Sequence, residues 1–242
     1  MRLIWVMILS VLQSTSFKSE QMQHARVKTA YTEKEKTVQQ YFQQQNLSYG
    51  VFNIFLRAFK KEQQLEVWVK QKGAGEFVLL HTYEICASSG SLGPKRKEGD
   101  MQVPEGIYEI NHFNPLSNFY LSLGINYPNT SDKILSDRKN PGGAIYIHGN
   151  CVTIGCIPIT DDFIKELYVL AVDARSNGQS KIPVHIYPTR LDNAGIKSLE
   201  KDFKGNTTLI AFWKNLQTIY QSFEETKDLK IIRINKKGEY YF

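Results

Sequence analysis

The sequence predicts an α+β protein that is rich in β-strand and has one main core. Its 242 residues are 42% hydrophobic and 12% aromatic, which is enough apolar material for a packed interior and excludes intrinsic disorder. Short runs of β-branched and aromatic residues recur along the chain, whereas helical spacing is confined to three segments. At roughly 150 residues per domain, this length corresponds to one sizeable unit with an appendage.

The N-terminus is typical of a secretory signal peptide. Arg2 supplies a positive charge, residues 3–12 form an apolar run, and Ser14 and Ser16 stand at the small-residue positions of a cleavage site. The alternative, a membrane anchor, requires ~20 apolar residues and is disfavoured. We therefore expect residues 1–16 to be removed, no transmembrane segment to remain, and the protein to be exported to the periplasm or cell envelope.

Charge and cysteine content narrow the function further. The formal net charge of +6 suits an anionic neighbour such as a cell-wall polymer, a lipid headgroup or nucleic acid, and export argues against nucleic acid as a partner. The three cysteines, Cys86, Cys151 and Cys156, are too few for a disulfide-stapled scaffold. Because their number is odd, at least one thiol is free or linked to a second molecule.

Helical spacing first occurs in an N-terminal helical segment, residues 17–48. A helix is expected from Thr32, which forms a capping box with Glu35, to Gln45. Three strand candidates follow, separated by turn-like segments, and these predict a β-meander. They are residues 51–59, 65–69 and 77–85.

Loops and short strands alternate in the middle of the chain. Residues 86–106 are dense in Gly, Pro and Ser, which indicates a long ordered loop of the kind that often carries function. A second loop is expected at residues 126–143. The strand candidates here are residues 107–113, 119–124 and 144–147.

The last part of the chain combines helices with strands. Thr160 is expected to cap a helix that ends at Gly178, and residues 182–187 alternate as a strand. Residues 189–242 predict a helix with one aromatic face and then a hairpin. That face needs the main domain, residues 49–188, to cover it.

The first long loop contains a basic run, Lys95, Arg96 and Lys97. It does not belong to a phosphate-binding Walker loop, because Gly93 is followed by Pro94 and the strand-loop-helix context is missing. Such a run is more often a solvated loop than a binding site. Beside an active site, however, it can hold a substrate carboxylate.

Residues 147–160, IHGNCVTIGCIPIT, contain the residue types for nucleophilic catalysis. A strand delivers His148, and Gly155 and Cys156 stand at a later turn before a helix. A cysteine attacks as its thiolate, and a neighbouring imidazole can take the thiol proton and return it to a leaving amine. Gly155 allows a substrate carbonyl to approach backbone amides that stabilise an oxyanion. This composition favours acyl transfer.

Other interpretations of these cysteines stay open on spacing alone. Cys151 and Cys156 can be buried small residues, because free cysteine is among the most buried residue types. They can also form a disulfide, or join His148 and His185 in a zinc site, but their spacing matches no common zinc pattern. A structural role is the default for His185, which alternates with apolar residues. Catalysis is only slightly favoured over packing.

Several motifs resemble the L,D-transpeptidase catalytic domain family, the YkuD-like enzymes. HGNCVTIGC is similar to the family's active-site signature, an HG turn followed by Ser/Thr-x-Gly-Cys. SGSLGPKRKEGDMQVPEGIYEI resembles its upstream segment, and FNPLSNFYLSLGINYPN with the helix-hairpin tail resembles the YafK-like branch. The resemblance runs from about Leu56 to the C-terminus. It implies a mixed β-sandwich with flanking helices and a C-terminal helix-hairpin extension.

The resemblance also implies a role for each site residue. Cys156 corresponds to the nucleophile and His148 to the general base and acid, while the Gly149 carbonyl orients the imidazole. Thr153 matches the family's Ser/Thr, and the amides near Gly155 and Cys156 correspond to the oxyanion hole. The thiolate would attack a carbonyl at the L-centre of a diaminopimelate-type residue in a peptidoglycan stem peptide and form a thioester. An amine or water would release it, with neither a metal nor a cofactor.

Two departures from the family pattern bear on the substrate. Pro158 stands where many members have an arginine that binds the donor carboxylate, so Arg96 or Arg138 is a candidate replacement and Lys95 a further one. The interval from histidine to cysteine is short and contains Cys151, as in the YafK-like branch. The activity of that branch resembles hydrolysis that detaches a lipoprotein from peptidoglycan.

We therefore expect hydrolysis of a peptidoglycan-linked peptide or lipoprotein, slightly ahead of two alternatives. One is a transpeptidase that forms crosslinks or attaches protein to the wall. The other is a silent wall-binding module in which Cys151 and Cys156 form a disulfide. Because a nucleophilic Cys156 must stay reduced, a disulfide in the active enzyme, if there is one, would join Cys86 to Cys151.

Overall fold

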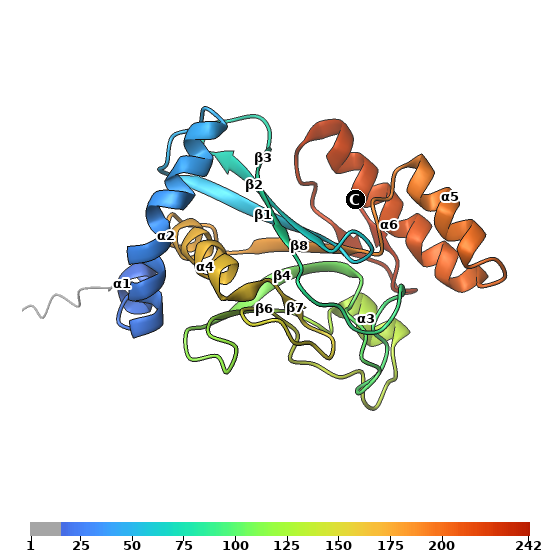
Figure 1. Cartoon of the computed structure of the whole chain (residues 1–242). Helices are drawn as coiled ribbons and strands as arrows, with labels where there is room; N and C mark the ends of the chain where they lie inside the picture. The colour runs from blue at the N-terminus through green and yellow to red at the C-terminus, as the bar shows by residue number, and fades with distance from the viewer. Residues whose placement is uncertain (1–15) are drawn as a thin grey trace, which may run out of the picture.

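The computed structural model describes residues 16–242, so the expected signal peptide lies almost entirely outside the described residues. Within this range the chain forms a mixed α+β fold around one large curled sheet, which confirms the predicted fold class (Figure 1). In this part of the chain, no helix has the length and apolar composition needed to cross a membrane.

The centre of the fold is an eight-stranded mixed sheet with the order β3-β2-β1-β8-β4-β5-β6-β7. The pairs β1/β8 and β6/β7 are parallel, and all other neighbours in this sheet are antiparallel. The first three strands form the expected meander, and β8 fits between β1 and β4. The strands are β1 Phe52–Phe59, β2 Gln64–Gln71, β3 Val78–Glu84, β4 Gly106–Asn114, β5 Ser122–Ile125, β6 Tyr146–His148, β7 Ile157–Pro158 and β8 Ile182–Tyr187.

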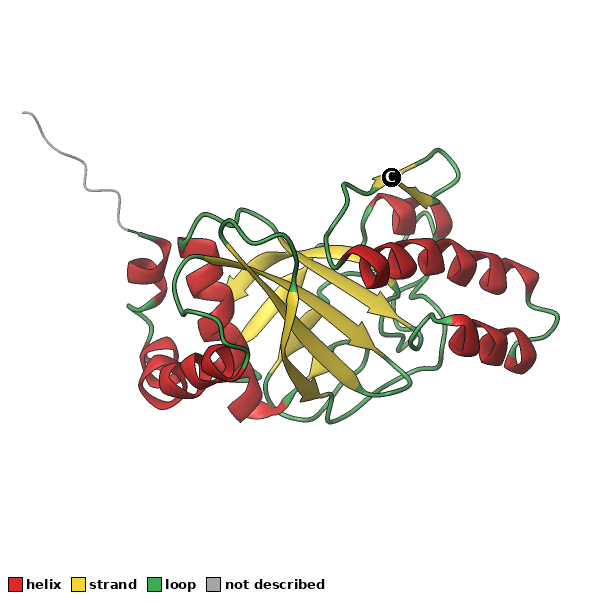
Figure 2. Ribbon diagram, turned by 90° about the horizontal axis from the view of Figure 1, so that it is seen from above, coloured by secondary structure: helices red, strands yellow, loops and turns green. Residues whose placement is uncertain are grey.

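Three helices cover one face of the sheet: α1 Phe17–Gln21, α2 Ala25–Gln44 and α4 Thr160–Ser176. Figure 2 shows them grouped at one side of the strands. α4 is buried along most of its length because it lies between α2 and the sheet. Alternation along β1 sends Leu56 into this core and Phe55 to the opposite face.

The C-terminal segment covers part of that opposite face. It consists of α5 Asn193–Asp202, α6 Thr207–Thr226 and a small hairpin, β9 Arg233–Ile234 with β10 Tyr240–Tyr241. Phe223 of α6 packs its ring edge-on against Phe55 and Trp68, with centroid distances of 4.9 and 5.0 Å. Burial of these aromatic rings therefore holds α6 on the meander.

Two predicted helix starts were wrong. α2 begins seven residues before Thr32, because Val27 is fully buried in the core and tertiary packing extends the helix beyond the capping box. Thr160 is the first residue of α4 and not its cap. The cap position is Ile159, which makes no side-chain hydrogen bond to the helix.

Two helices were not predicted from the sequence. α3 Thr130–Leu135 lies inside the loop expected at residues 126–143 and starts with a capping box of Asn129 and Asp132. α5 starts at the cap Asp192, whose side chain accepts from two backbone amides. Both start signals are present in the sequence. The helices are too short to show the repeated apolar spacing that reveals a longer one.

Candidate active site

The parallel pair β6/β7 brings the two candidate catalytic residues to the same edge of the sheet. β6 ends at His148, which pairs with Pro158, and Cys156 immediately precedes β7. Continuing this register by one residue puts Cys156 opposite Tyr146. Since strand residues alternate between faces, Cys156 and His148 then lie on the same side of the pair.

His148 is buried and held in one orientation. Its Nδ1 lies 2.5 Å from the carbonyl oxygen of Gly149, and the ring of Phe119 stacks on the imidazole at 4.4 Å between centroids. A carbonyl can only accept, so Nδ1 carries the proton and Nε2 is the unprotonated nitrogen of the neutral ring. Burial lowers the pKa of His148, and the bond to Gly149 acts in the opposite direction. His148 is therefore a neutral base over a wider pH range than a solvated histidine.

Cys156 is a free, partly exposed thiol. Burial raises its pKa, while a hydrogen bond from the Tyr146 backbone and the charge of Lys95 act to lower it. The Sγ atom lies 3.8 Å from the carbonyl oxygen of Ala144. A thiol in this setting is protonated near neutral pH and needs a base to become nucleophilic.

The turn before Cys156 is fixed by a hydroxyl and a glycine. Thr153 Oγ1 donates to the carbonyl oxygen of Cys156 at 2.8 Å and accepts from the amide of Gly155 at 3.0 Å. Gly155 has φ +134°, and a Cβ there would lie 2.9 Å from the carbonyl oxygen of Gln102. Glycine is therefore required at this position, and its amide is engaged by Thr153.

The HG turn, like the turn before Cys156, has no room for a side chain at its glycine. The amide of Gly149 donates to the carbonyl of Phe119 at 3.1 Å, and a Cβ at Gly149 would approach this same oxygen to 2.7 Å. The next amide, that of Asn150, donates to Asp161 Oδ1 at 2.7 Å. These contacts tie the turn to Phe119, in the segment before β5, and to the first turn of α4.

Cys86 and Cys151 form a disulfide, with their Cα atoms 5.6 Å apart, and Cys156 is free. This pairing is the one expected if Cys156 stays reduced, and it contradicts the alternative of a bond between Cys151 and Cys156. The amide of Cys86 also donates to the carbonyl of Pro158 at 3.0 Å. The disulfide thus fastens the loop between His148 and Cys156 to the segment after β3.

No group of His, Cys, Asp and Glu side chains suited to a metal ion occurs among residues 16–242. His185 is buried in β8, where its ring meets Phe55 edge-on at 4.6 Å. Burial lowers the pKa of His185 to about 3, with the Arg57 charge acting in the same direction. It is therefore a neutral core residue, and the structure does not bring it together with Cys151 and His148 as a ligand set.

Residues 93–97, which we call the site loop, contain two of the basic candidates. Lys95 is buried, and its Nζ forms an ion pair with Asp100 at 2.6 Å. Its charge is nevertheless close enough to favour the thiolate of Cys156. Lys95 is thus placed to influence the nucleophile while its own ammonium group is already partnered.

Arg96, the second basic candidate in the site loop, contacts α6 and α3, and Arg138 lies outside this loop. The guanidinium of Arg96 stands 5.1 Å from the ring centre of Phe212 in α6, and its Nη1 is 3.4 Å from Asp132 in α3. Arg138 is exposed in the loop that follows α3. The role of either arginine as a ligand of the donor carboxylate stays a prediction.

A buried ion pair that the sequence analysis missed supports the site loop. Lys60 Nζ lies 3.0 Å from Glu105 Oε1 and donates to the carbonyl of Gly93 at 2.8 Å. Glu105 also accepts from the amide of Gly93 and from the indole of Trp213 in α6, both at 2.7 Å. Lys60 and Cys156 line the same small cavity. Glu105 belongs to the PEG element, but no linear pattern shows that Lys60 reaches it.

The curled mixed sheet, with its HG turn and Gly-Cys element side by side, defines a catalytic domain of the transpeptidase class. The family model of the L,D-transpeptidase catalytic domain, YkuD, matches residues 54–186. The chain belongs to this family.

Individual relatives agree with this assignment. The chain is 35% identical over 177 residues to YafK of Escherichia coli strain K12, provisionally described as an L,D-transpeptidase, and the match covers 72% of this chain and 68% of YafK. YafK of Escherichia coli O157:H7 matches with the same identity and coverage.

Two solved structures show a weaker likeness. The helical cell shape determining protein Pgp2 from Campylobacter jejuni has a TM-score of 0.46 at 18% identity, covering 78% of this chain and 74% of that chain. Bdellovibrio bacteriovorus Bd1075 has a TM-score of 0.41 at 21% identity, covering 71% of this chain and 62% of that chain. At these scores the likeness carries no functional argument.

Proposed function

We propose that this protein is an exported cysteine enzyme that cleaves peptidoglycan stem peptides at the L-centre of a diaminopimelate-type residue and so releases a wall-linked peptide or lipoprotein. The observation that carries the proposal is the bond between His148 Nδ1 and the Gly149 carbonyl, because it leaves Nε2 free to act on the Cys156 thiol. Membership of the YkuD family supports the substrate class. The export step rests on the N-terminal sequence.

The reaction follows from these groups in two halves. His148 Nε2 takes the thiol proton as Cys156 Sγ attacks the carbonyl carbon and forms the C–S bond. The Gly155 amide is engaged with Thr153, so we assign the oxyanion to the Cys156 amide. The C–N bond then breaks, and the imidazolium gives its proton to the leaving amine. Water, deprotonated by the same nitrogen, hydrolyses the thioester and restores the thiol.

Crosslink formation, or attachment of a protein to the wall, is the second candidate, and membership of a transpeptidase family favours it. In that reaction an amine replaces water as the acceptor of the acyl group. The nucleophile and the base are the same, so variants of these residues do not separate the two reactions. Their products do.

To test this proposal, the mature protein is incubated with sacculi that carry or lack attached protein, and the products are analysed by mass spectrometry. Hydrolysis predicts truncated stem peptides and release of the attached chain, and crosslinking predicts new dimers. Cys156→Ala and His148→Asn should abolish either product, whereas His112→Asn, at an exposed histidine of β4, should not. Full activity of Cys156→Ala would refute the mechanism.

A further inference from the structure

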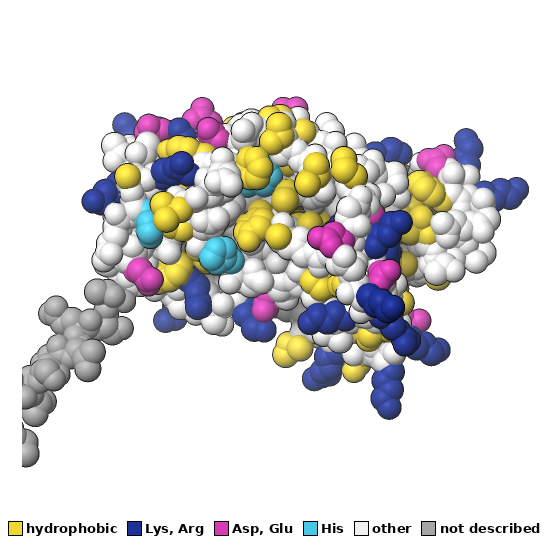
Figure 3. Space-filling view, turned by 90° about the horizontal axis from the view of Figure 1, so that it is seen from below, with side chains coloured by type: hydrophobic (Ala, Val, Ile, Leu, Met, Phe, Trp, Pro, Cys, Tyr) yellow, Lys and Arg dark blue, Asp and Glu magenta, His cyan; other side chains and the backbone are white. Residues whose placement is uncertain are grey.

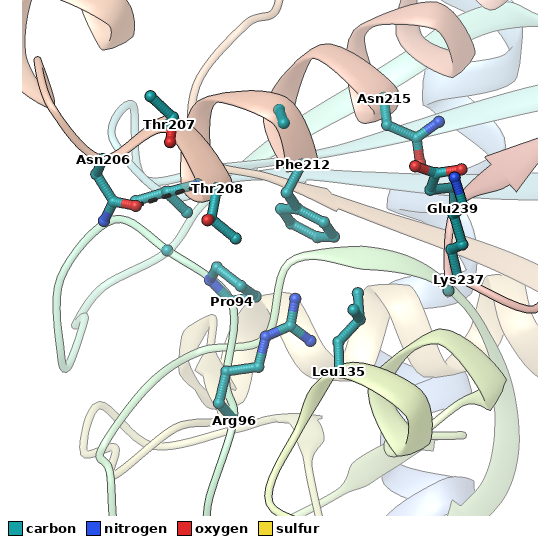
Figure 4. Close-up of a pocket in the computed structure, with 14 residues that line it drawn as sticks. Pro94, Arg96, Leu135, Asn206, Thr207, Thr208, Phe212, Asn215, Lys237 and Glu239 are labelled. Atoms are coloured by element: carbon teal, nitrogen blue, oxygen red, sulfur yellow. Dashed lines mark hydrogen bonds between the residues drawn. The ribbon is translucent and has the colours of Figure 1, made fainter.

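A groove of about 780 Å³ lies between the site loop and the C-terminal extension. Its walls are Gly93, Pro94 and Arg96 of the site loop, the first turns of α6, Leu135 of α3 and the tip of the β9–β10 hairpin (Figure 4). The site loop thus contributes Lys95 to the surroundings of Cys156 and the next residue, Arg96, to the groove. This arrangement joins the groove to the catalytic edge through one short segment.

The groove combines an apolar floor with a cation. Leu135, Leu209 and Phe212 supply apolar surface, and Figure 4 shows Arg96 reaching toward Phe212 and Leu135. Its guanidinium stacks over the Phe212 ring, and its side chain is 28% exposed. A guanidinium has five N–H donors, and the contact of Arg96 with Asp132 at 3.4 Å leaves most of them available to a carboxylate.

Other charges around the groove favour an acidic occupant. Lys237 lines it from the hairpin tip and is exposed, while Thr207 and Thr208 present the N-terminal end of α6. The one carboxylate in the lining, that of Glu239, accepts a hydrogen bond from Asn235 at 2.7 Å. The side chains that line the groove therefore carry two positive charges and one negative charge.

The surface next to the groove is also basic. Lys and Arg side chains gather over α3 and its following loop (Figure 3). The exposed basic residues of this region are Lys97, Lys133, Arg138 and Lys139. A field of this sign raises the local concentration of a polyanion near the groove.

We propose that the groove binds a second stem peptide of the peptidoglycan, with a free carboxylate on Arg96 and an alanyl methyl group against Phe212. Stem peptides combine both chemistries, and the charges of the lining complement the carboxylate. The identity of the polymer rests on the proposed function, but the site itself does not. A stem peptide bound in this groove holds the enzyme on the wall at a point separate from the peptide that reacts.

The test is titration of Cys156→Ala protein with a disaccharide-tripeptide muropeptide, followed by backbone amide NMR. The Thr207, Thr208 and Phe212 amides should shift on binding. Arg96→Gln in the same background should weaken this binding about tenfold or more, as loss of a charge-assisted hydrogen bond requires. Lys237→Glu should weaken it as well. The matched control is Lys236→Glu, an exposed neighbour in the same turn that does not line the groove, and it should bind normally.

Three results would overturn the assignment: equal shifts with the disaccharide alone, shifts confined to residues around Cys156, or equal effects of Lys237→Glu and Lys236→Glu. Because this titration uses protein without the nucleophile, it is independent of catalysis. Groove binding without cleavage of sacculi would refute the proposed function alone. Cleavage without groove binding would refute the groove alone.

Discussion

Replacement of Glu105 by glutamine tests how strongly the buried ion pair holds the site loop and α6 to the sheet. Glu105 is fully buried, and the Lys60 side chain is 4% exposed. Removing one partner of such a pair typically costs about 3–5 kcal/mol, because the remaining charge stays in a poorly solvated place. The whole stability of a domain is about 5–15 kcal/mol, so the loss should be large.

The surrounding contacts place the expected loss at the lower end of this range. Lys60 keeps its hydrogen bonds to the carbonyls of Gly93 and Val103, at 2.8 and 2.9 Å. A glutamine oxygen can still accept from the Trp213 indole. We therefore expect Glu105→Gln to reduce the free energy of unfolding by about 3 kcal/mol. Urea denaturation followed by tryptophan fluorescence measures this change.

Two further variants separate the charge from the packing. Glu105→Gln combined with Lys60→Met removes both charges and should recover much of the lost stability, since no unpaired charge remains. Trp213→Phe removes the hydrogen bond to the carboxylate and also part of a fully buried ring system, so it should cost at least the value of that bond, about 1.5–3 kcal/mol. A loss below about 1 kcal/mol for Glu105→Gln, the value of an exposed pair, would show that this ion pair does not anchor the loop.

Three other changes probe the catalytic edge. Thr153→Val removes two hydrogen bonds worth about 1 kcal/mol each and should lower kcat in the sacculus assay about tenfold. Thr153→Ser keeps the hydroxyl and should stay active. Equal kcat values for the two variants would contradict the role of the hydroxyl. Replacing both Cys86 and Cys151 by serine should lower the free energy of unfolding by about 2–4 kcal/mol in denaturation experiments and leave one titratable thiol. Iodoacetamide alkylation of Cys156 should reach half its maximal rate at a higher pH than alkylation of a model thiol, because burial raises the pKa of Cys156. The acid limb of the pH profile of kcat/KM should lie below the usual histidine pKa, because His148 must be neutral to act as the base and burial lowers its pKa. An alkylation midpoint at or below that of the model thiol would contradict this assignment.

Local patterns predicted most strands because each pattern depends only on consecutive residues. β8 coincides with the predicted residues 182–187, where apolar alternation is unbroken. The pattern did not show which strands would pair, since β8 pairs with β1 and β4, which are far away in the chain. The prediction of the start of α2 failed for a related reason, since α2 packs on α4 and Val27 is buried in the main core, which its neighbours in sequence do not show.

The same division applies to the site. The motif HGNCVTIGC predicts His148 and Cys156 as site residues because the signature lies in consecutive residues, and the structure brings both to one edge of the sheet. The direction of Arg96 depends on α6, which is more than a hundred residues away in the chain and supplies the ring of Phe212. The partnership of Lys60 with Glu105 joins the end of β1 to the start of β4. Such long-range contacts need the fold before they can be recognised.

The two pKa directions together determine the resting state of the site. A thiol whose pKa is raised and an imidazole whose pKa is lowered are both neutral near pH 7, so in the proposed mechanism the charge separation arises only when the thiol proton moves to His148 during attack. Oxidation of cysteine depends on thiolate character and exposure, so a neutral, partly buried Cys156 resists it. The other two cysteines are already joined to each other, which removes the nearest protein thiols as competitors for a disulfide with Cys156. An odd number of cysteines is therefore compatible with the proposed export to an oxidising compartment and with a Cys156 that stays reduced there.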